Sequence, residues 1–122
     1  MNTFSLQRLT YHPLSLGSIQ PKGWLKRQLE IQANGLSGHL DEFWDDIKNS
    51  QWIGGDSEGW ERFPYWLDGL IPLAFLVDGS LLKNKVKRYV DMILMNQHKD
   101  GWLGPRQMKP SNDADTIKTY DL

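Results

Sequence analysis

The sequence predicts an all-α fold in which helices pair as antiparallel helical hairpins. Apolar residues recur at intervals of three and four along four stretches of the chain, and this spacing places them on one face of a helix. Short connections rich in glycine or proline separate these stretches. The alternation of apolar and polar residues that is typical of a half-buried strand does not occur between them. Helices joined by short connections run in opposite directions, so we expect hairpins.

Composition and charge exclude several classes of function. The chain has 122 residues, of which 39% are hydrophobic and 24% charged, as in a soluble single-domain protein. Its 14 basic and 15 acidic residues are mixed along the chain, so nucleic acid is not an expected partner. It contains no cysteine, which excludes disulfides and thiolate metal sites. No signal peptide or membrane-spanning run is recognised, so we expect a cytoplasmic protein without a membrane partner.

Residues 1–20 are predicted to form an extended lead-in, because Pro13 and Gly17 interrupt any helix. Its apolar side chains either pack across neighbouring helices or belong to a partly disordered segment. Helical hairpins are expected over residues 21–105. The first helix is predicted to begin near Pro21, since proline suits the first helical position. Its apolar face consists of Leu25, Leu29, Ala33 and Leu36.

Gly35 and Gly38 are predicted to end the first helix, and Ser37 is the predicted N-cap of a short second helix. It would form the first hairpin with the helix before it. Its apolar stripe consists of Leu40, Phe43, Trp44 and Ile47, and its acidic side consists of Asp41, Glu42, Asp45 and Asp46. Carboxylates at helical spacing can bind a hard cation. The simpler interpretation is a solvated face whose charges complement the helix dipole.

The third predicted helix begins at Pro64 and is apolar on almost every side as far as Val77. Such a helix is expected to be surrounded by protein. Pro72 lies within it and should bend its axis, and Gly69 makes the bend easier.

The fourth predicted helix follows a tight turn at residues 78–80, with Ser80 as its N-cap. Its apolar side consists of Leu82, Val86, Tyr89, Val90, Ile93 and Leu94. Its basic side chains, Lys83, Lys85, Lys87 and Arg88, alternate with these core positions, which indicates a solvated face. Residues 106–122 are polar and contain several helix breakers, so they form either a tail or the start of a further helix.

The loop over residues 49–63 combines Trp52 and Trp60 with glycines, carboxylates and Arg62. Sugar recognition uses this combination, because an indole face stacks on the CH face of a sugar ring while charged groups hydrogen-bond its hydroxyls. An alternative is purely structural, with Trp60 and Trp66 filling the core. His39 is either a sugar ligand or a residue at a helix entry.

The segment from Gln97 to Trp102 has the features of a helix end, a glycine turn and an aromatic residue that packs back over the turn. It is similar to the Q…G…W repeats of helical toroids such as the terpene cyclases. The aspartate-rich motif of those enzymes is not present in the chain, so a structural role is the preferred interpretation.

Four motifs together resemble one glycoside hydrolase family. They are PLSLGSIQPKGWL at 13–25, GHLDEFW at 38–44, GWERFPYWLDGLIPLA at 59–74 and DGWLGP at 100–105. This pattern is similar to the N-terminal part of the β-L-arabinofuranosidase-like glycoside hydrolases, family 127. The resemblance implies part of an (α/α) six-hairpin toroid. It also implies roles in the wall of a sugar pocket for Trp60, Glu61, Tyr65, Trp66 and Asp68.

The resemblance does not supply a catalytic centre. Relatives in that family use a zinc-bound cysteine nucleophile together with glutamates from segments beyond those represented here. The catalytic residues are therefore unknown, and we expect no cofactor in this chain, zinc belonging to a complete family member. The expected function is that of an N-terminal portion of a glycoside hydrolase, inactive alone, with a carbohydrate such as an arabinofuranoside as its substrate. The alternative is a small helical carbohydrate-binding or interaction module that self-associates through its apolar helix.

Overall fold

The computed structural model describes residues 9–106, and in this range the chain is all-α, as predicted. Its helices are α1 (Gly23–Asn34), α2 (Leu36–Phe43), α3 (Asp45–Lys48), α4 (Arg62–Leu76) and α5 (Ser80–Met95), with a 3-10 turn η1 (Gln51–Ile53). The start of the predicted lead-in and nearly all of the predicted tail lie outside the described residues. None of the described helices combines the length and apolar content that a membrane crossing requires.

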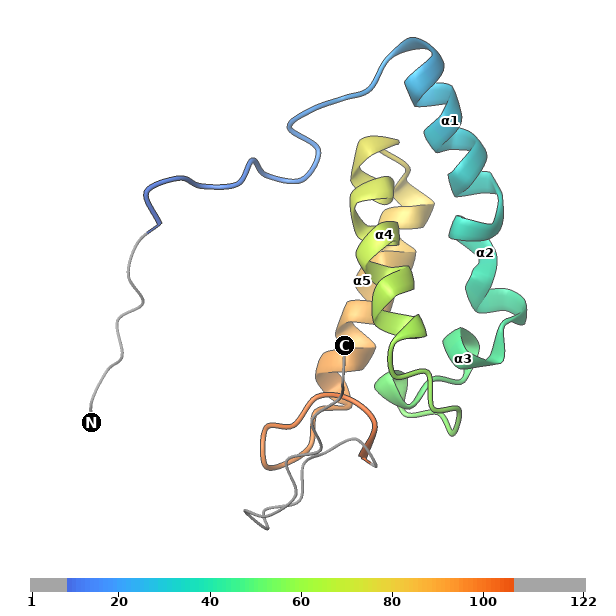
Figure 1. The fold of residues 1–122 in the computed structure, drawn as a ribbon, viewed down its shortest axis with the longest axis vertical. Helices are drawn as coiled ribbons and strands as arrows, with labels where there is room; N and C mark the ends of the chain where they lie inside the picture. The colour runs from blue at the N-terminus through green and yellow to red at the C-terminus, as the bar shows by residue number, and fades with distance from the viewer. Residues whose placement is uncertain (1–8, 107–122) are drawn as a thin grey trace, which may run out of the picture.

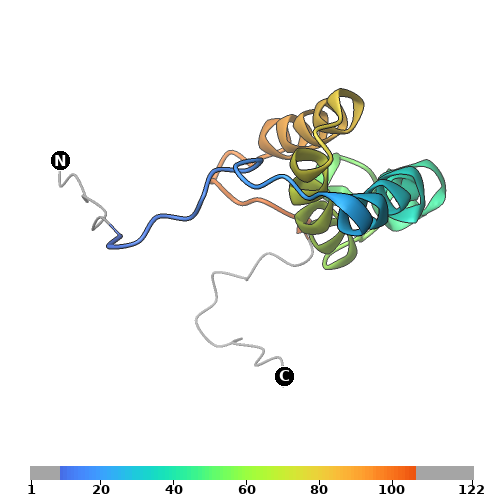
Figure 2. The same cartoon turned by 90° about the horizontal axis from the view of Figure 1, so that it is seen from above.

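The helices form three roughly parallel columns with α4 in the middle. Figure 1 shows that α1 and α2 follow one another in the same direction, that α4 runs back, and that α5 runs opposite to α4. Seen from above, α4 lies between the α1–α2 column and α5 (Figure 2). The prediction that the first two helices form a hairpin is therefore wrong, because only Gly35 separates them and the chain does not reverse there.

Two interruptions differ from the predicted helix ends. Gly35, and not Ser37, occupies the N-cap position of α2, and Ser37 lies within that helix. The predicted second helix also stops at Trp44, whose extended backbone (φ −89°, ψ 116°) separates α2 from the short α3. Gly38 is required at the first junction, because a Cβ atom there would lie 1.8 Å from the carbonyl oxygen of Ala33.

The core forms around one side of α4. Buried apolar side chains come mainly from this helix and from α5, and they are Ile47, Phe63, Trp66, Leu67, Leu70, Leu73, Ala74, Val86 and Tyr89. Phe63, Trp66 and Tyr89 pack edge to face, with ring centroids 5.2 to 5.8 Å apart. This geometry favours the electrostatics of aromatic pairs and joins α4 to α5.

The prediction that protein surrounds the third helix on every side is only partly met. Tyr65, Asp68 and Gly69 of α4 face solvent, opposite its buried side. The column formed by α1 is more exposed still, since none of its residues is buried and Trp24 is 77% exposed.

The described part of the lead-in, residues 9–20, is extended and lacks a helix. Leu14 and Leu16 are exposed, so they do not pack across the helices. The segment is held near the end of α4 by Gln20, whose amide donates to the carbonyl oxygens of Gly17 and Phe75.

Candidate functional site

Three tryptophans form a continuous stack in the loop that precedes α4 and the segment that follows α5. The ring centroids of Trp52 and Trp60 lie 5.5 Å apart, and those of Trp60 and Trp102 lie 6.2 Å apart, with nearly parallel planes. The indole N–H of Trp52 donates to the carbonyl oxygen of Trp60 at 3.0 Å. A Cβ atom at Gly104 would lie 2.9 Å from the Trp60 ring, so a glycine lets the chain pass close to the stack.

The polar side chains of this loop bind other parts of the loop and its neighbours. The Ser57 hydroxyl donates to Asp46 at 2.9 Å, and the Arg62 guanidinium lies 3.1 Å from the same carboxylate. Glu58 accepts a hydrogen bond from the backbone N–H of Trp60 at 3.1 Å. The tryptophan rings therefore stack on one another, and Glu58 and Arg62 make their contacts within the loop and with Asp46.

Glu61, Tyr65 and Asp68 form an exposed stripe along α4, which we call the α4 stripe. They are spaced by four and three residues, so their side chains lie on one face of the helix. Tyr65 is 73% exposed, and a carboxylate lies about one turn from it on either side. Within residues 9–106, none of these three side chains makes a hydrogen bond or ion pair. In the described part of the chain, the stripe therefore combines an aromatic ring and two carboxylates that have no side-chain partner.

Trp66 lies on the opposite side of α4 from the stripe. It is only 8% exposed, and its indole N–H donates to the carbonyl oxygen of Ser37 at 2.8 Å. This position corresponds to the structural alternative for Trp66, in which it fills the core. Three of the predicted sugar-contacting residues are thus brought together on α4, while Trp60 belongs to the tryptophan stack.

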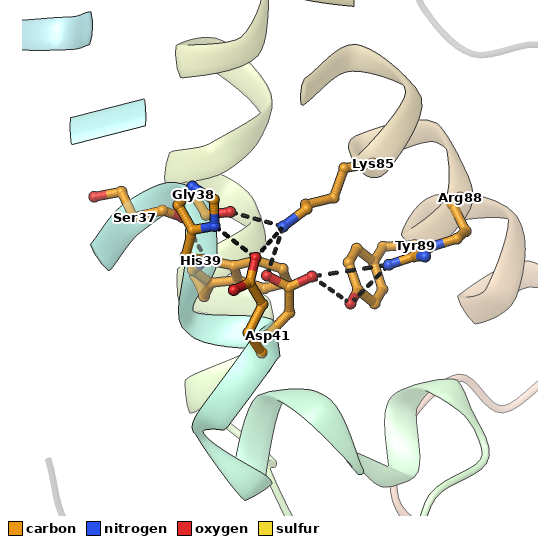
Figure 3. Close-up of polar contacts among 9 residues, drawn as sticks. Ser37, Gly38, His39, Asp41, Lys85, Arg88 and Tyr89 are labelled. Atoms are coloured by element: carbon orange, nitrogen blue, oxygen red, sulfur yellow. Dashed lines mark hydrogen bonds and ion pairs between the residues drawn. The ribbon is translucent and has the colours of Figure 1, made fainter. Parts of the chain in front are cut away.

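A buried polar group joins α2 to α5, and we call it the Asp41 cluster (Figure 3). Lys85 Nζ donates to Asp41 Oδ1 at 2.8 Å and to the carbonyl oxygen of Gly38 at 2.7 Å. The Tyr89 hydroxyl donates to Asp41 Oδ2 at 2.9 Å and accepts from Arg88 at 3.1 Å. Both oxygens of the Asp41 carboxylate are therefore satisfied, as a buried charge requires.

The cluster corrects two predictions. The sequence pattern placed Asp41 on a solvated acidic face and Lys85 on a solvated basic face. In the structure, Asp41 is buried at 8% exposure and the Lys85 side chain is four-fifths buried. The reason is that α2 packs against α4 on the side from which Asp41 projects toward α5, so the carboxylate meets Lys85 and Tyr89 there.

Burial is the main cause that raises the pKa of Tyr89 to about 12, and the neighbouring Asp41 carboxylate raises it further. Both effects favour the neutral phenol that donates to Asp41. At the turn between α4 and α5, the Lys83 ammonium hydrogen-bonds Asp78 and lowers the pKa of that exposed carboxyl. The pKa shift of Tyr89 therefore belongs to the cluster that joins α2 to α5, whereas that of Asp78 belongs to an ion pair on the surface.

His39 lies apart from the other predicted site residues, at a cleft of about 470 Å³ between the α1–α2 column and the start of α5. Its Nδ1 atom lies 2.5 Å from Glu42 Oε1. The cleft is lined by Glu30, Ala33, Asn34, Gly38, His39, Val77, Gly79, Ser80, Leu81, Leu82 and Lys85. Lys85 therefore belongs both to the Asp41 cluster and to the cleft.

Sequence reasoning missed the Asp41 cluster because its members are far apart in the chain. Asp41 and Tyr89 are separated by 48 residues. One signal was available in Tyr89, which was predicted to face the core and whose hydroxyl would need a buried partner. Nothing in the local pattern identified Asp41 as that partner.

A thiolate zinc site does not fit the residues present. The chain has no cysteine. Within residues 9–106 there is also no group of three or more histidine, aspartate or glutamate side chains that could hold a metal ion.

Comparison of the chain with models of known protein families, with curated proteins and with solved structures gave no match.

Proposed function

We propose that this chain forms part of the wall of a carbohydrate-binding cleft in a glycoside hydrolase domain, as an N-terminal portion of that domain. Its substrate would be a glycoside such as an arabinofuranoside. The observation that supports this proposal is the α4 stripe, where Tyr65 stands exposed between Glu61 and Asp68. We assign sugar binding to these residues and no catalytic role.

The chemistry of the stripe suits a sugar. A phenol ring provides a flat apolar surface for the CH groups of the ring, and carboxylates accept hydrogen bonds from hydroxyl groups. The opposite side of α4 is packed into the core through Phe63, Trp66 and Leu70. The stripe is thus carried by a fixed helix, which reduces the entropy lost when a ligand binds.

The helix arrangement is consistent with a larger helical domain. In an (α/α) six-hairpin toroid, α4 and α5 would form one hairpin, and their opposite directions support this assignment. The exposed stripe of α4 would then face the cavity of the toroid. Other helices would supply the opposite wall and the groups that cleave the glycosidic bond.

The proposal is tested by titrating the chain with methyl α-L-arabinofuranoside and an arabinofuranosyl oligosaccharide, followed by NMR and calorimetry. We expect saturable shifts at residues 61–68. Tyr65→Ala should abolish detectable binding, whereas Tyr65→Phe should retain it because the stacking ring remains. Glu61→Gln and Asp68→Asn should each weaken binding about three- to tenfold, the effect of one hydrogen bond.

Trp24→Ala is the matched control, since Trp24 is an equally exposed aromatic residue on α1. Loss of binding in this variant, or full binding by Tyr65→Ala, would contradict the proposal. Binding through the stripe with no glycoside hydrolysis by any protein that contains the chain would favour the alternative, a helical carbohydrate-binding module.

A further inference from the structure

The cleft beside α5 has the size and lining of a small-molecule site. Its volume is about 470 Å³, within the range of roughly 300–1,000 Å³ that ligand pockets occupy. It lies between α1, α2 and the N-terminal part of α5, away from the α4 stripe. Aliphatic side chains provide much of its surface, namely Ala33, Val77, Leu81 and Leu82.

Hydrogen bonds between the helices that line the cleft hold its walls in place. Lys85 Nζ joins α5 to the carbonyl oxygen of Gly38 at the start of α2. One residue earlier, the carbonyl oxygen of Ser37 accepts from Trp66 of α4. The contact of Gly38 with Ala33 leaves no space for a side chain at this junction. The α1–α2 wall is therefore fixed relative to α4 and α5, and a ligand would meet a preformed cleft.

Each charged side chain in the lining has a partner of opposite sign. Lys85 pairs with Asp41 at 2.8 Å, and His39 when protonated pairs with Glu42 at 2.5 Å. Glu30 pairs more loosely with Lys26 at 3.9 Å. A charged ligand would have to break one of these pairs or remain unpaired, so the lining favours an uncharged ligand.

Two polar groups of the lining are available to such a ligand. The Ser80 hydroxyl and the Nε2 atom of His39 make no hydrogen bond within residues 9–106. His39 Nδ1 is held by Glu42, which directs the unused Nε2 as an acceptor when the ring is neutral. A ligand hydroxyl can hydrogen-bond either group, because it can donate to His39 Nε2 and can donate to or accept from the Ser80 hydroxyl.

We propose that this cleft binds an uncharged small molecule with hydroxyl groups at one end and an aliphatic body, and that an alkyl glycoside represents this class. The hydroxyl end binds Ser80 and His39. The aliphatic body covers Leu81 and Leu82, of which Leu81 is 86% exposed in the free protein. Burying that leucine against an alkyl chain supplies the hydrophobic part of the affinity.

The test is an NMR titration of the full chain with n-hexyl β-D-glucopyranoside below its micelle concentration. We expect saturable shifts of the Val77, Leu81 and Leu82 methyl groups and of the His39 ring. Glucose alone and hexanol alone should each bind at least about tenfold more weakly, since each lacks one half of the contacts. Leu81→Ala should weaken binding about tenfold and Ser80→Ala roughly fivefold.

One variant controls this experiment. Leu94→Ala removes an exposed leucine of α5 that does not line the cleft, and it should leave binding unchanged. Shifts at residues 61–68 without shifts of the Val77, Leu81 and Leu82 methyl groups would show that the glycoside binds the α4 stripe instead, and they would overturn this proposal. The proposal is overturned if the shifts do not saturate, if Leu94→Ala weakens binding as much as Leu81→Ala, or if hexanol alone binds as tightly as the glycoside.

Discussion

The tryptophan stack and the Asp41 cluster join parts of the chain by opposite means. The stack consists of large aromatic residues in segments rich in glycine, and it is partly exposed. The cluster consists of an aspartate, a lysine and a tyrosine from two helices, and it is largely buried. The stack contains the residues that most suggest ligand binding, yet its rings contact one another. Burial and pairing, more than residue type, determine which groups are available for function.

The difference has an energetic consequence. A stack of rings loses contact area when one ring is removed, and its remaining rings can adjust or meet water. A buried carboxylate that is removed leaves an ammonium and a hydroxyl without their partner in a place that water reaches poorly. The cluster should therefore be far more sensitive to a single substitution than the stack.

The largest expected effect is that of Asp41→Ala. This change leaves Lys85 and Tyr89 without their common acceptor, and we expect a loss of about 3 to 5 kcal/mol in the free energy of unfolding. Urea denaturation followed by circular dichroism measures it.

Asp91→Ala is the matched control for that variant. It breaks an exposed Lys–Asp pair, with Lys87, and should cost less than about 1 kcal/mol. The triple change Asp41→Leu, Lys85→Met and Tyr89→Phe removes every charge of the central contacts and should recover most of the loss. Equal effects of Asp41→Ala and Asp91→Ala would show that the cluster is not energetically distinct from surface pairs.

The second effect depends on pH. The pKa of Tyr89 rises from 10.0 to about 12 in the folded protein. Between these values the unfolded chain releases the proton that the folded chain retains, so stability is complete below pH 10 and falls as the pH rises to 12. A shift of this size corresponds to about 3 kcal/mol at most.

Denaturation curves at intervals from pH 9 to 12 test this expectation. Tyr89→Phe should flatten the decline over that range, whereas Tyr65→Phe should not, because Tyr65 is an exposed tyrosine outside the cluster. A decline of the same steepness in the wild type and Tyr89→Phe would mean that another group controls alkaline stability.

The helices were predictable because their signals are local. The period of apolar residues identified the regions of α1, α4 and α5, since side chains on one face of a helix recur every three to four residues. The direction of the chain after α1 was not predictable. Gly35 suggested a reversal, whereas the structure shows α1 and α2 in line. A single glycine permits a break without determining its direction.

The candidate sites were predictable only in part, for a related reason. Glu61, Tyr65 and Asp68 share a helix face by spacing alone, so their proximity follows from the sequence. The pairing of Asp41 with Lys85 depends on how α2 and α5 are placed in space, and α4 lies between these two helices in the sequence. Charged residues between apolar positions look solvated until that placement is known, which is why both were misassigned.

The smallest expected effect is that of Trp60→Ala, which removes the ring that contacts both Trp52 and Trp102. Each aromatic pair contributes about 0.5 to 1.5 kcal/mol beyond its buried area, so we expect a loss of about 2 kcal/mol and a weaker near-ultraviolet circular dichroism signal. Trp60→Phe should lose only about half as much stability as Trp60→Ala, because a smaller ring remains in the stack. Binding of the arabinofuranoside through the α4 stripe should be unchanged in both variants when measured well below their unfolding temperatures. A large loss of sugar affinity with no loss of stability would instead place Trp60 in contact with the sugar and make the stack part of the binding site.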